Sequence, residues 1–363
     1  MSLLHWIKSK IWQNRFSQVV EDVGDAFAVA PRRMVHVVVM DGTLSSLEEG
    51  FETNAGLAYQ LLKRNAGLGV TLHYQPGLQF DRGNFLASAW SVLTGSGLDL
   101  QIQQVYGALA SRYQPGDEIF LIGYSRGAFA ARSLAGLIDR VGLLRRDQAT
   151  QRHVSLTYRH YRDGGAGLRT FAKDYCHLGV PIAAIGVWDT VKALGLRLPG
   201  LWWLFKGKYQ FHNHQISACV GAGFQALALD ETRDTYRPEM WEDTPDRPVH
   251  LQQVWFVGNH GDVGGQVMGS PQTRPLANIP FVWLMQRLQD CGLPLPKAWE
   301  EEFAQDVQRL RPAIGADLIG CFGRGPGVWL DVFVQSLFIP ASLIGGLDAV
   351  SSCIMIQVVE PVA

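Results

Sequence analysis

The sequence carries little charge and no block of basic residues. Of its 363 residues, 18% are charged and 47% are hydrophobic, and the formal net charge is -1. Proteins that bind nucleic acid usually show a basic patch or stripe, so this composition excludes nucleic acid as the main partner. The apolar fraction is enough for a large buried core, which excludes disorder over most of the chain.

The cysteines form no C-x-x-C pair and lie far apart along the chain. An odd, scattered set indicates reduced thiols in the core of a cytosolic protein rather than a disulfide framework. The five residues are Cys176, Cys219, Cys291, Cys321 and Cys353.

The sequence also lacks the patterns of a signal peptide and of a membrane span. The stretch MSLLHWIKSKIWQNRFSQVV at 1–20 has charges every few residues and no apolar centre. The longest uncharged apolar run, at 332–347, contains Pro340 and is shorter than a bilayer-spanning helix. We therefore expect a cytoplasmic protein, with contact to a membrane surface or non-classical delivery left open.

Hydrophobic strand-like runs alternate with helical segments along most of the chain. This order predicts an α/β fold with a mostly parallel central sheet and helices on both faces. Strands are expected at 33–40, 70–77, 117–123 and 181–191 and from 251 onward, and helices at 53–67, 98–116, 125–142, 213–231 and 276–292.

The domain layout follows from the same pattern. We expect one catalytic domain over 31–295, preceded by an amphipathic helix at 1–30 and followed by a partly apolar C-terminal extension at 296–363. The stretches near 142–180 and 196–250 are longer than typical connections, so we interpret them as insertions into this domain.

The strongest local motif is Gly123-Tyr124-Ser125-Arg126-Gly127, between a hydrophobic strand and a helix. G-x-S-x-G in this context predicts a nucleophilic serine held on a strained turn, with Gly123 and Gly127 allowing close backbone approach. The Arg126 N–H, at the start of the helix, is expected to face the developing oxyanion. The alternative is a small turn that only packs a helix against a strand.

A serine hydroxyl needs a base, and the base needs an orienting carboxylate. Asp189 and His260 each follow the end of an expected strand, and His260 lies in a Gly-rich loop. The order Ser125, Asp189, His260 is the one this fold uses. Asp262 is the rival carboxylate, with a turn-stabilising role as its simpler interpretation. A metal site at His260 and Asp262 would need more ligands than this loop offers, so we expect no metal and no cofactor.

The stretch VVVMDGTLSS at 37–46 resembles the D-x-D-G-T loop of a class of phosphatases, but the position of their nucleophile is Val39. A valine cannot accept a phosphoryl group, so we expect a supporting role. The N–H of Gly42 or Thr43 is a candidate second oxyanion donor, with Asp41 holding the loop through backbone N–H groups. A purely structural turn is the alternative.

Several motifs together resemble a known family. MDGT, YQPG, PGDEIFLIGYSRGAFAARSLAGLI, IGVWDTVKALG, QALALDETRDTYRPEMW and GNHGDVGG occur here in the order typical of the DUF2235 family, over roughly 33–290. That family includes the α/β-hydrolase domain of Tle1-type phospholipase effectors of bacterial type VI secretion. The resemblance implies an α/β-hydrolase-like fold, with nucleophile, acid and base at Ser125, Asp189 and His260. Delivery by a secretion system is not implied, because the long membrane-anchoring region of the large effectors is not in this sequence.

We therefore predict a serine hydrolase that cleaves carboxylic esters, most simply a lipase or phospholipase acting on membrane lipids through an acyl-enzyme on Ser125. The segment LPGLWWLFKGKY at 198–209 combines aromatic and basic residues and is a candidate lid or lipid-facing patch, with core packing as the alternative. The expected partners are a lipid or other ester and a membrane surface; protein partners are left open. The alternative function is a non-catalytic module of the same fold that binds a membrane or a protein.

Overall fold

The computed structural model describes residues 19–23, 33–43, 45–65, 69–77, 96–191, 215–233, 236–242, 249–267, 271–303 and 356–357. At its centre is an eight-stranded sheet with the order β1-β3-β2-β4-β7-β8-β9-β10. Its strands are β1 (Val19–Val23), β2 (Val35–Met40), β3 (Val70–Gln75), β4 (Glu118–Tyr124), β7 (Ile182–Trp188), β8 (Val220–Ala228), β9 (His250–Phe256) and β10 (Ile356–Gln357).

The six inner strands of this sheet, β3 to β9 in its spatial order, are all parallel. The two edge strands, β1 and β10, pair antiparallel. Parallel neighbours need crossover connections, and helices lie in those from β2 to β3, from β3 to β4 and from β4 to β7. The main helices are α2 (Asn54–Asn65), α4 (Ser96–Ala110), α5 (Arg126–Val141), α6 (Gln151–Asp163), α7 (Leu168–Tyr175), α8 (His260–Gly264) and α9 (Arg274–Asp290). Short 3-10 turns cover Arg146–Gln148, Pro271–Thr273 and Trp299–Glu302.

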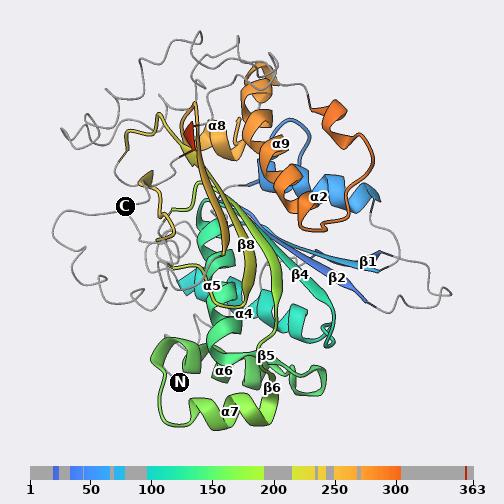
Figure 1. Ribbon diagram of the computed structural model, residues 1–363, viewed down its shortest axis with the longest axis vertical. Helices are drawn as coiled ribbons and strands as arrows, with labels where there is room; N and C mark the ends of the chain where they lie inside the picture. Colours follow the sequence, from blue (N-terminus) through green and yellow to red (C-terminus); the bar gives the residue numbers. More distant parts are fainter. Residues whose placement is uncertain are drawn as a thin grey trace, which may run out of the picture.

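Helices cover both faces of the sheet, as Figure 1 shows, with α4, α5 and α6 on one side and α2 and α9 on the other. The alternation along β2 explains the two cores. Val38 and Met40 belong to the core under α4 and α5, whereas Val37 and Val39 belong to the core under α2 and α9. Side chains on a strand point to opposite faces in turn, so a run of valines serves both cores. This arrangement confirms the predicted α/β-hydrolase-like architecture.

The predicted insertion near 142–180 forms a compact unit beside the lower end of α5 (Figure 1). It contains α6, α7 and a two-stranded antiparallel pair, β5 (Leu143–Leu144) and β6 (Cys176–His177). The Tyr106 hydroxyl joins it to α4, because it donates to Gly142 O at 2.9 Å and accepts from Leu144 N at 2.9 Å.

Two expectations from the sequence are wrong. Residues 19–23 form an edge strand against β3, so the helix expected over 1–30 does not include them. The helix expected over 213–231 is replaced by β8, a nearly fully buried strand between β7 and β9. Its small residues give no clear periodicity, and pairing on both sides decides the conformation. The region 196–250 is therefore not a simple insertion, because it contains a strand of the central sheet.

The start of the predicted C-terminal extension packs against the domain. Trp299 is 1% exposed, and its Nε1 donates to Gln289 Oε1 of α9 at 3.0 Å. Farther along, only β10 is described. The aromatic segment at 198–209 and the apolar run at 332–347 lie outside the described residues. No helix in the described part of the chain combines the length and apolar character that crossing a bilayer requires.

Candidate active site

Ser125 lies on the sharp turn between β4 and α5, with a φ of 56°. At both flanking glycines, backbone atoms of another segment lie too close to leave room for a side chain. A Cβ on Gly127 would come within 2.1 Å of Met40 O, and a Cβ on Gly123 within 2.7 Å of Ala128 Cα. Any side chain at these positions would push α5 away from β2 and β4, so the turn requires glycine there. The strained turn presents the serine hydroxyl at the carboxyl edge of the sheet.

The structure brings Ser125, His260 and Asp189 into one hydrogen-bonded chain. Ser125 Oγ lies 2.8 Å from His260 Nε2, and His260 Nδ1 lies 2.6 Å from Asp189 Oδ2. All three side chains are buried, with Asp189 fully inaccessible. An ionised carboxylate only accepts hydrogen bonds, so Nδ1 carries the proton and Nε2 is free to accept from the serine hydroxyl.

Asp189 is fixed from two sides. Its backbone N–H donates to Ala226 O at 2.7 Å, and its second carboxylate oxygen, Oδ1, accepts from Ala228 N at 3.0 Å. Both contacts come from β8, the strand that the sequence did not predict. The position of the carboxylate therefore depends on β8.

Asp262 caps the helix that carries His260. Asp262 Oδ2 accepts from Asn259 N at 2.9 Å, while Asn259 Oδ1 accepts from Gly261 N at 2.8 Å and from Asp262 N at 3.2 Å. This reciprocal capping box fixes the first turn of α8. Asp262 thus fixes the backbone of the turn that carries His260. The carboxylate that contacts the imidazole is that of Asp189.

Two tyrosine rings pack against the His260 imidazole. The Tyr124 ring is stacked on it at 5.0 Å between centroids, and the Tyr236 ring lies at 4.8 Å with a 50° tilt. The Tyr124 hydroxyl also donates to His260 O at 3.2 Å. These contacts restrict rotation of the imidazole away from Ser125.

An ion pair supports the same loop. Glu231 Oε2 accepts from His260 N at 3.2 Å, and Arg233 donates to both Glu231 oxygens, at 2.8 and 2.6 Å. Burial alone would raise the pKa of Glu231, but the hydrogen bonds from Arg233 outweigh it and keep that pKa below its usual value. The Arg233 guanidinium also lies 3.9 Å from the centre of the Tyr236 ring. Glu231, Arg233 and Tyr236 were not singled out from the sequence, although they share the motif LDETRDTYRPEMW.

The Asp41 loop lies next to Ser125, since a Cβ on Gly42 would be 3.4 Å from Ser125 Cβ. The Asp41 carboxylate accepts from Gly42 N at 2.6 Å, from the Tyr74 hydroxyl at 2.7 Å and from Thr53 Oγ1 at 2.7 and 2.9 Å. Burial raises the pKa of Asp41 to about 6, although these hydrogen bonds oppose the rise. Of the two expected oxyanion donors in this loop, Gly42 has its N–H bonded to Asp41 in this structure.

Thr43 differs from Gly42. Among the described residues no acceptor binds its N–H, and its Oγ1 is buried without a hydrogen-bond partner. Buried polar groups without partners are rare in folded proteins, so Thr43 is an exception in the loop beside Ser125. The carbonyl of Thr43 is tied to the histidine loop, because Gln266 Nε2 donates to it at 3.3 Å.

The described His, Cys, Asp and Glu residues include no group of three or more placed to hold a metal ion.

A strand-turn-helix elbow at the carboxyl edge of a parallel sheet, with a histidine and a carboxylate supplied by later strands, defines the α/β-hydrolase class. The family that this chain matches belongs to the lipase- and esterase-like hydrolases within that class. The chain belongs to the family of Tle1-like phospholipase effectors of type VI secretion, whose catalytic-domain model matches residues 33–287.

Individual relatives are more distant. An uncharacterized protein of Saccharomyces cerevisiae, YEL023C, is 30% identical in an alignment of 240 residues, and the match covers 58% of this chain and 33% of the yeast protein. The chain thus spans about a third of the length of that relative.

The solved structures that resemble this chain share low sequence identity with it. One is an uncharacterized protein from Pseudomonas aeruginosa, with 14% identity, a TM-score of 0.45 and coverage of 76% of this chain and 49% of the other. The Tle1 effector bound to the VgrG spike has 16% identity, a TM-score of 0.36 and coverage of 68% and 56%. A putative carboxylesterase from Lactobacillus plantarum has 14% identity, a TM-score of 0.39 and coverage of 75% and 90%.

Proposed function

We propose that the protein is a serine hydrolase that cleaves carboxylic esters of membrane lipids through an acyl-enzyme on Ser125. The observation that carries this proposal is the chain of hydrogen bonds from Ser125 Oγ to His260 to the buried Asp189. The family to which the chain belongs supports a phospholipid as the substrate.

In the first half of the reaction, Ser125 Oγ attacks the ester carbonyl while His260 Nε2 takes the hydroxyl proton. Asp189 keeps the imidazole in the reactive tautomer and stabilises the imidazolium that forms. The tetrahedral intermediate collapses when the ester oxygen leaves as an alcohol with the proton from His260. Water, activated by the same histidine, then cleaves the acyl-enzyme and releases a fatty acid.

The negative charge on the carbonyl oxygen needs fixed donors. We assign these to the backbone N–H of Arg126, at the first position of α5, and to the N–H of Thr43. Asp41 holds the Thr43 loop by binding Gly42 N. Loss of one such donor typically lowers kcat by about 10²- to 10³-fold.

The test is Ser125→Ala in the full chain, assayed on phospholipid vesicles by lipid mass spectrometry and on p-nitrophenyl esters. We expect loss of both activities with an unchanged fold. Ser133→Ala is a matched control, because Ser133 is a second buried serine, within α5, and its hydroxyl donates only to Phe129 O. Full turnover by Ser125→Ala would disprove the proposal.

A fluorophosphonate probe separates the enzyme from a non-catalytic module of the same fold. The wild type and Ser133→Ala should be labelled at Ser125, since the probe reacts only with an activated serine. Folded wild-type protein that takes no label would favour the binding module.

A further inference from the structure

Arg126 is a partly buried cation without an acid partner beside the nucleophile. It follows Ser125 directly, and no hydrogen bond or ion pair joins its guanidinium to another described residue. Three other arginines around the site have hydrogen-bond partners. Arg233 binds Glu231, Arg274 donates to Gly265 O at 2.8 Å, and Arg132 donates to Glu239 O.

Arg126 lies at the elbow itself. Its backbone begins α5 directly after Ser125, and Tyr236 lies within electrostatic range of its guanidinium. The Tyr236 ring in turn packs on the ring of His260 at 4.8 Å. Arg126 and His260 therefore share Tyr236 as a neighbour.

An unpaired guanidinium that has lost part of its hydration is unfavourable, and proteins normally pair such a charge. Burial indeed lowers the pKa of Arg126, although an arginine stays protonated. A neutral ester offers this cation only the transient charge of the tetrahedral intermediate. A phosphodiester near the ester offers a permanent anion of the right geometry for two parallel hydrogen bonds.

We propose that Arg126 is a specificity-determining residue whose guanidinium binds the phosphodiester of a phospholipid substrate while Ser125 attacks its acyl ester. This inference rests on the proposed serine-hydrolase function and deepens it. It distinguishes lipids with a phosphate from neutral lipids that present the same acyl ester.

The experiment compares two lipids with identical acyl chains, phosphatidylcholine and diacylglycerol, in detergent micelles. Wild type, Arg126→Gln and Arg126→Lys are assayed for kcat/KM on both lipids. Arg152→Gln is the matched control, because it removes one positive charge from an exposed position on α6. Fluorophosphonate labelling of each variant monitors whether Ser125 is still reactive.

For Arg126→Gln we expect kcat/KM to fall on phosphatidylcholine about 10- to 100-fold more than on diacylglycerol, the usual effect of losing a charged hydrogen-bond partner. Arg126→Lys should recover part of this preference, and Arg152→Gln should keep the wild-type ratio. Equal losses on the two lipids, or no loss on either, would overturn the proposal.

A second measurement does not depend on the variants folding well. Glycerophosphocholine, which carries the phosphodiester without acyl chains, should competitively inhibit hydrolysis of a neutral p-nitrophenyl ester by the wild type. Its inhibition constant should rise at least 10-fold in Arg126→Gln. A wild type that hydrolyses the ester without such inhibition would reject the phosphate site and leave the serine-hydrolase function standing, whereas Ser125→Ala with full activity would reject the function itself.

Discussion

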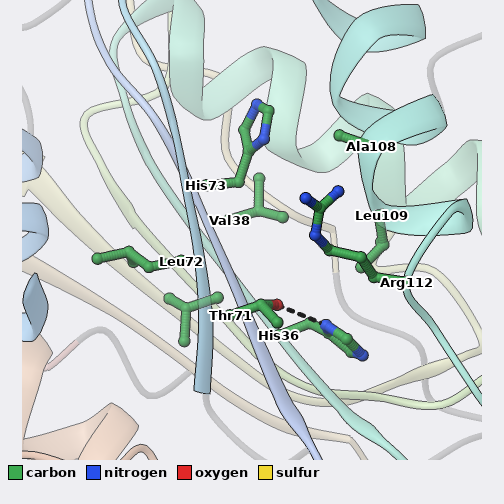
Figure 2. Close-up of a pocket in the computed structure, with 9 residues that line it drawn as sticks. His36, Val38, Thr71, Leu72, His73, Ala108, Leu109 and Arg112 are labelled. Atoms are coloured by element: carbon green, nitrogen blue, oxygen red, sulfur yellow. Dashed lines mark hydrogen bonds between the residues drawn. The ribbon is translucent and has the colours of Figure 1, made fainter. Parts of the chain in front are cut away.

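Replacement of His73 by leucine should stabilise the protein, and more so in mild acid than at neutral pH. His73 lies on β3, is 7% exposed, and has no hydrogen-bond partner for either ring nitrogen. Figure 2 shows its ring and the Arg112 side chain pointing toward the same small hollow between β3 and α4. The imidazole is thus buried next to a cation.

The size of this pH effect follows from the difference between the pKa of His73 in the folded chain and in the unfolded chain. Burial lowers the pKa of His73 from 6.5 to about 4, with a small further effect of Arg112, although Gln75 opposes the change. Between these values the unfolded chain takes up a proton and the folded chain does not, so stability falls as the pH drops. At 1.36 kcal/mol per pKa unit, lowering the pH from 6.5 to 5.0 removes about 2 kcal/mol.

Leucine at position 73 removes this dependence. At pH 7.5 the gain is limited to removing two unpaired buried nitrogens, about 1–3 kcal/mol. At pH 5.0 the gain should be about 2 kcal/mol larger. Urea unfolding followed by circular dichroism at both pH values measures the difference.

His250→Leu is the control, because His250 is an exposed histidine at the start of β9. It should change stability by the same small amount at both pH values. If His73→Leu gives equal free-energy changes at pH 7.5 and 5.0, the imidazole is not held neutral by burial and the reasoning fails.

The remaining predictions concern the site and its support. Asp41→Asn should remove a pH dependence of stability with the opposite sign. Burial raises the pKa of Asp41 from 3.8 to about 6, so the folded chain binds this proton at a higher pH than the unfolded chain does. The free energy of unfolding of the wild type therefore gains about 3 kcal/mol from Asp41 as the pH falls from 6 to 4. Urea titrations should then show a steeper acid loss in the variant, and an unchanged slope would contradict the assignment. Glu231→Gln should weaken the Arg233 pair that supports His260 N and lower kcat on p-nitrophenyl esters about 10-fold with little change in KM; unaltered kcat would show that the pair is dispensable. Gly127→Ala should destabilise the elbow by several kcal/mol or prevent folding, because its Cβ would overlap Met40 O, whereas Gly167→Ala has room, its nearest atom lying at 3.7 Å; equal melting temperatures would refute the steric argument.

The sequence predicts those parts of the fold that depend on local pattern. The run of valines in β2, the strand before Ser125 and the amphipathic α5 carry their own periodicity and turn signals. Strand β8 does not, because its Gly and Ala residues suit either conformation and only pairing with β7 and β9 decides between them.

The same division applies to the candidate site. Ser125, Asp189 and His260 each follow an apolar run, and the G-x-S-x-G motif around Ser125 and the Gly-rich loop around His260 added to that local signal. Contacts between distant segments carry no such local signal. Tyr236 on the imidazole, Glu231 on the His260 backbone and Thr53 on Asp41 become visible only when the sheet brings their loops together.

Backbone strain is concentrated where the chemistry is proposed. Among the described residues other than glycine, positive φ angles occur at Ser125, Asp189 and Ala298, and the first two are hydrogen-bonded to His260. Each such conformation costs about 1–2 kcal/mol and persists only where the surroundings fix it. Here Ser125 N donates to Trp188 O at 3.0 Å, and Asp189 N donates to Ala226 O at 2.7 Å. These two bonds link the strained residues across the sheet, from β4 to β7 and from β7 to β8, so the central strands set the distance between Ser125 and Asp189. Strain at two of the three residues of one hydrogen-bonded chain is the geometry expected of a functional site.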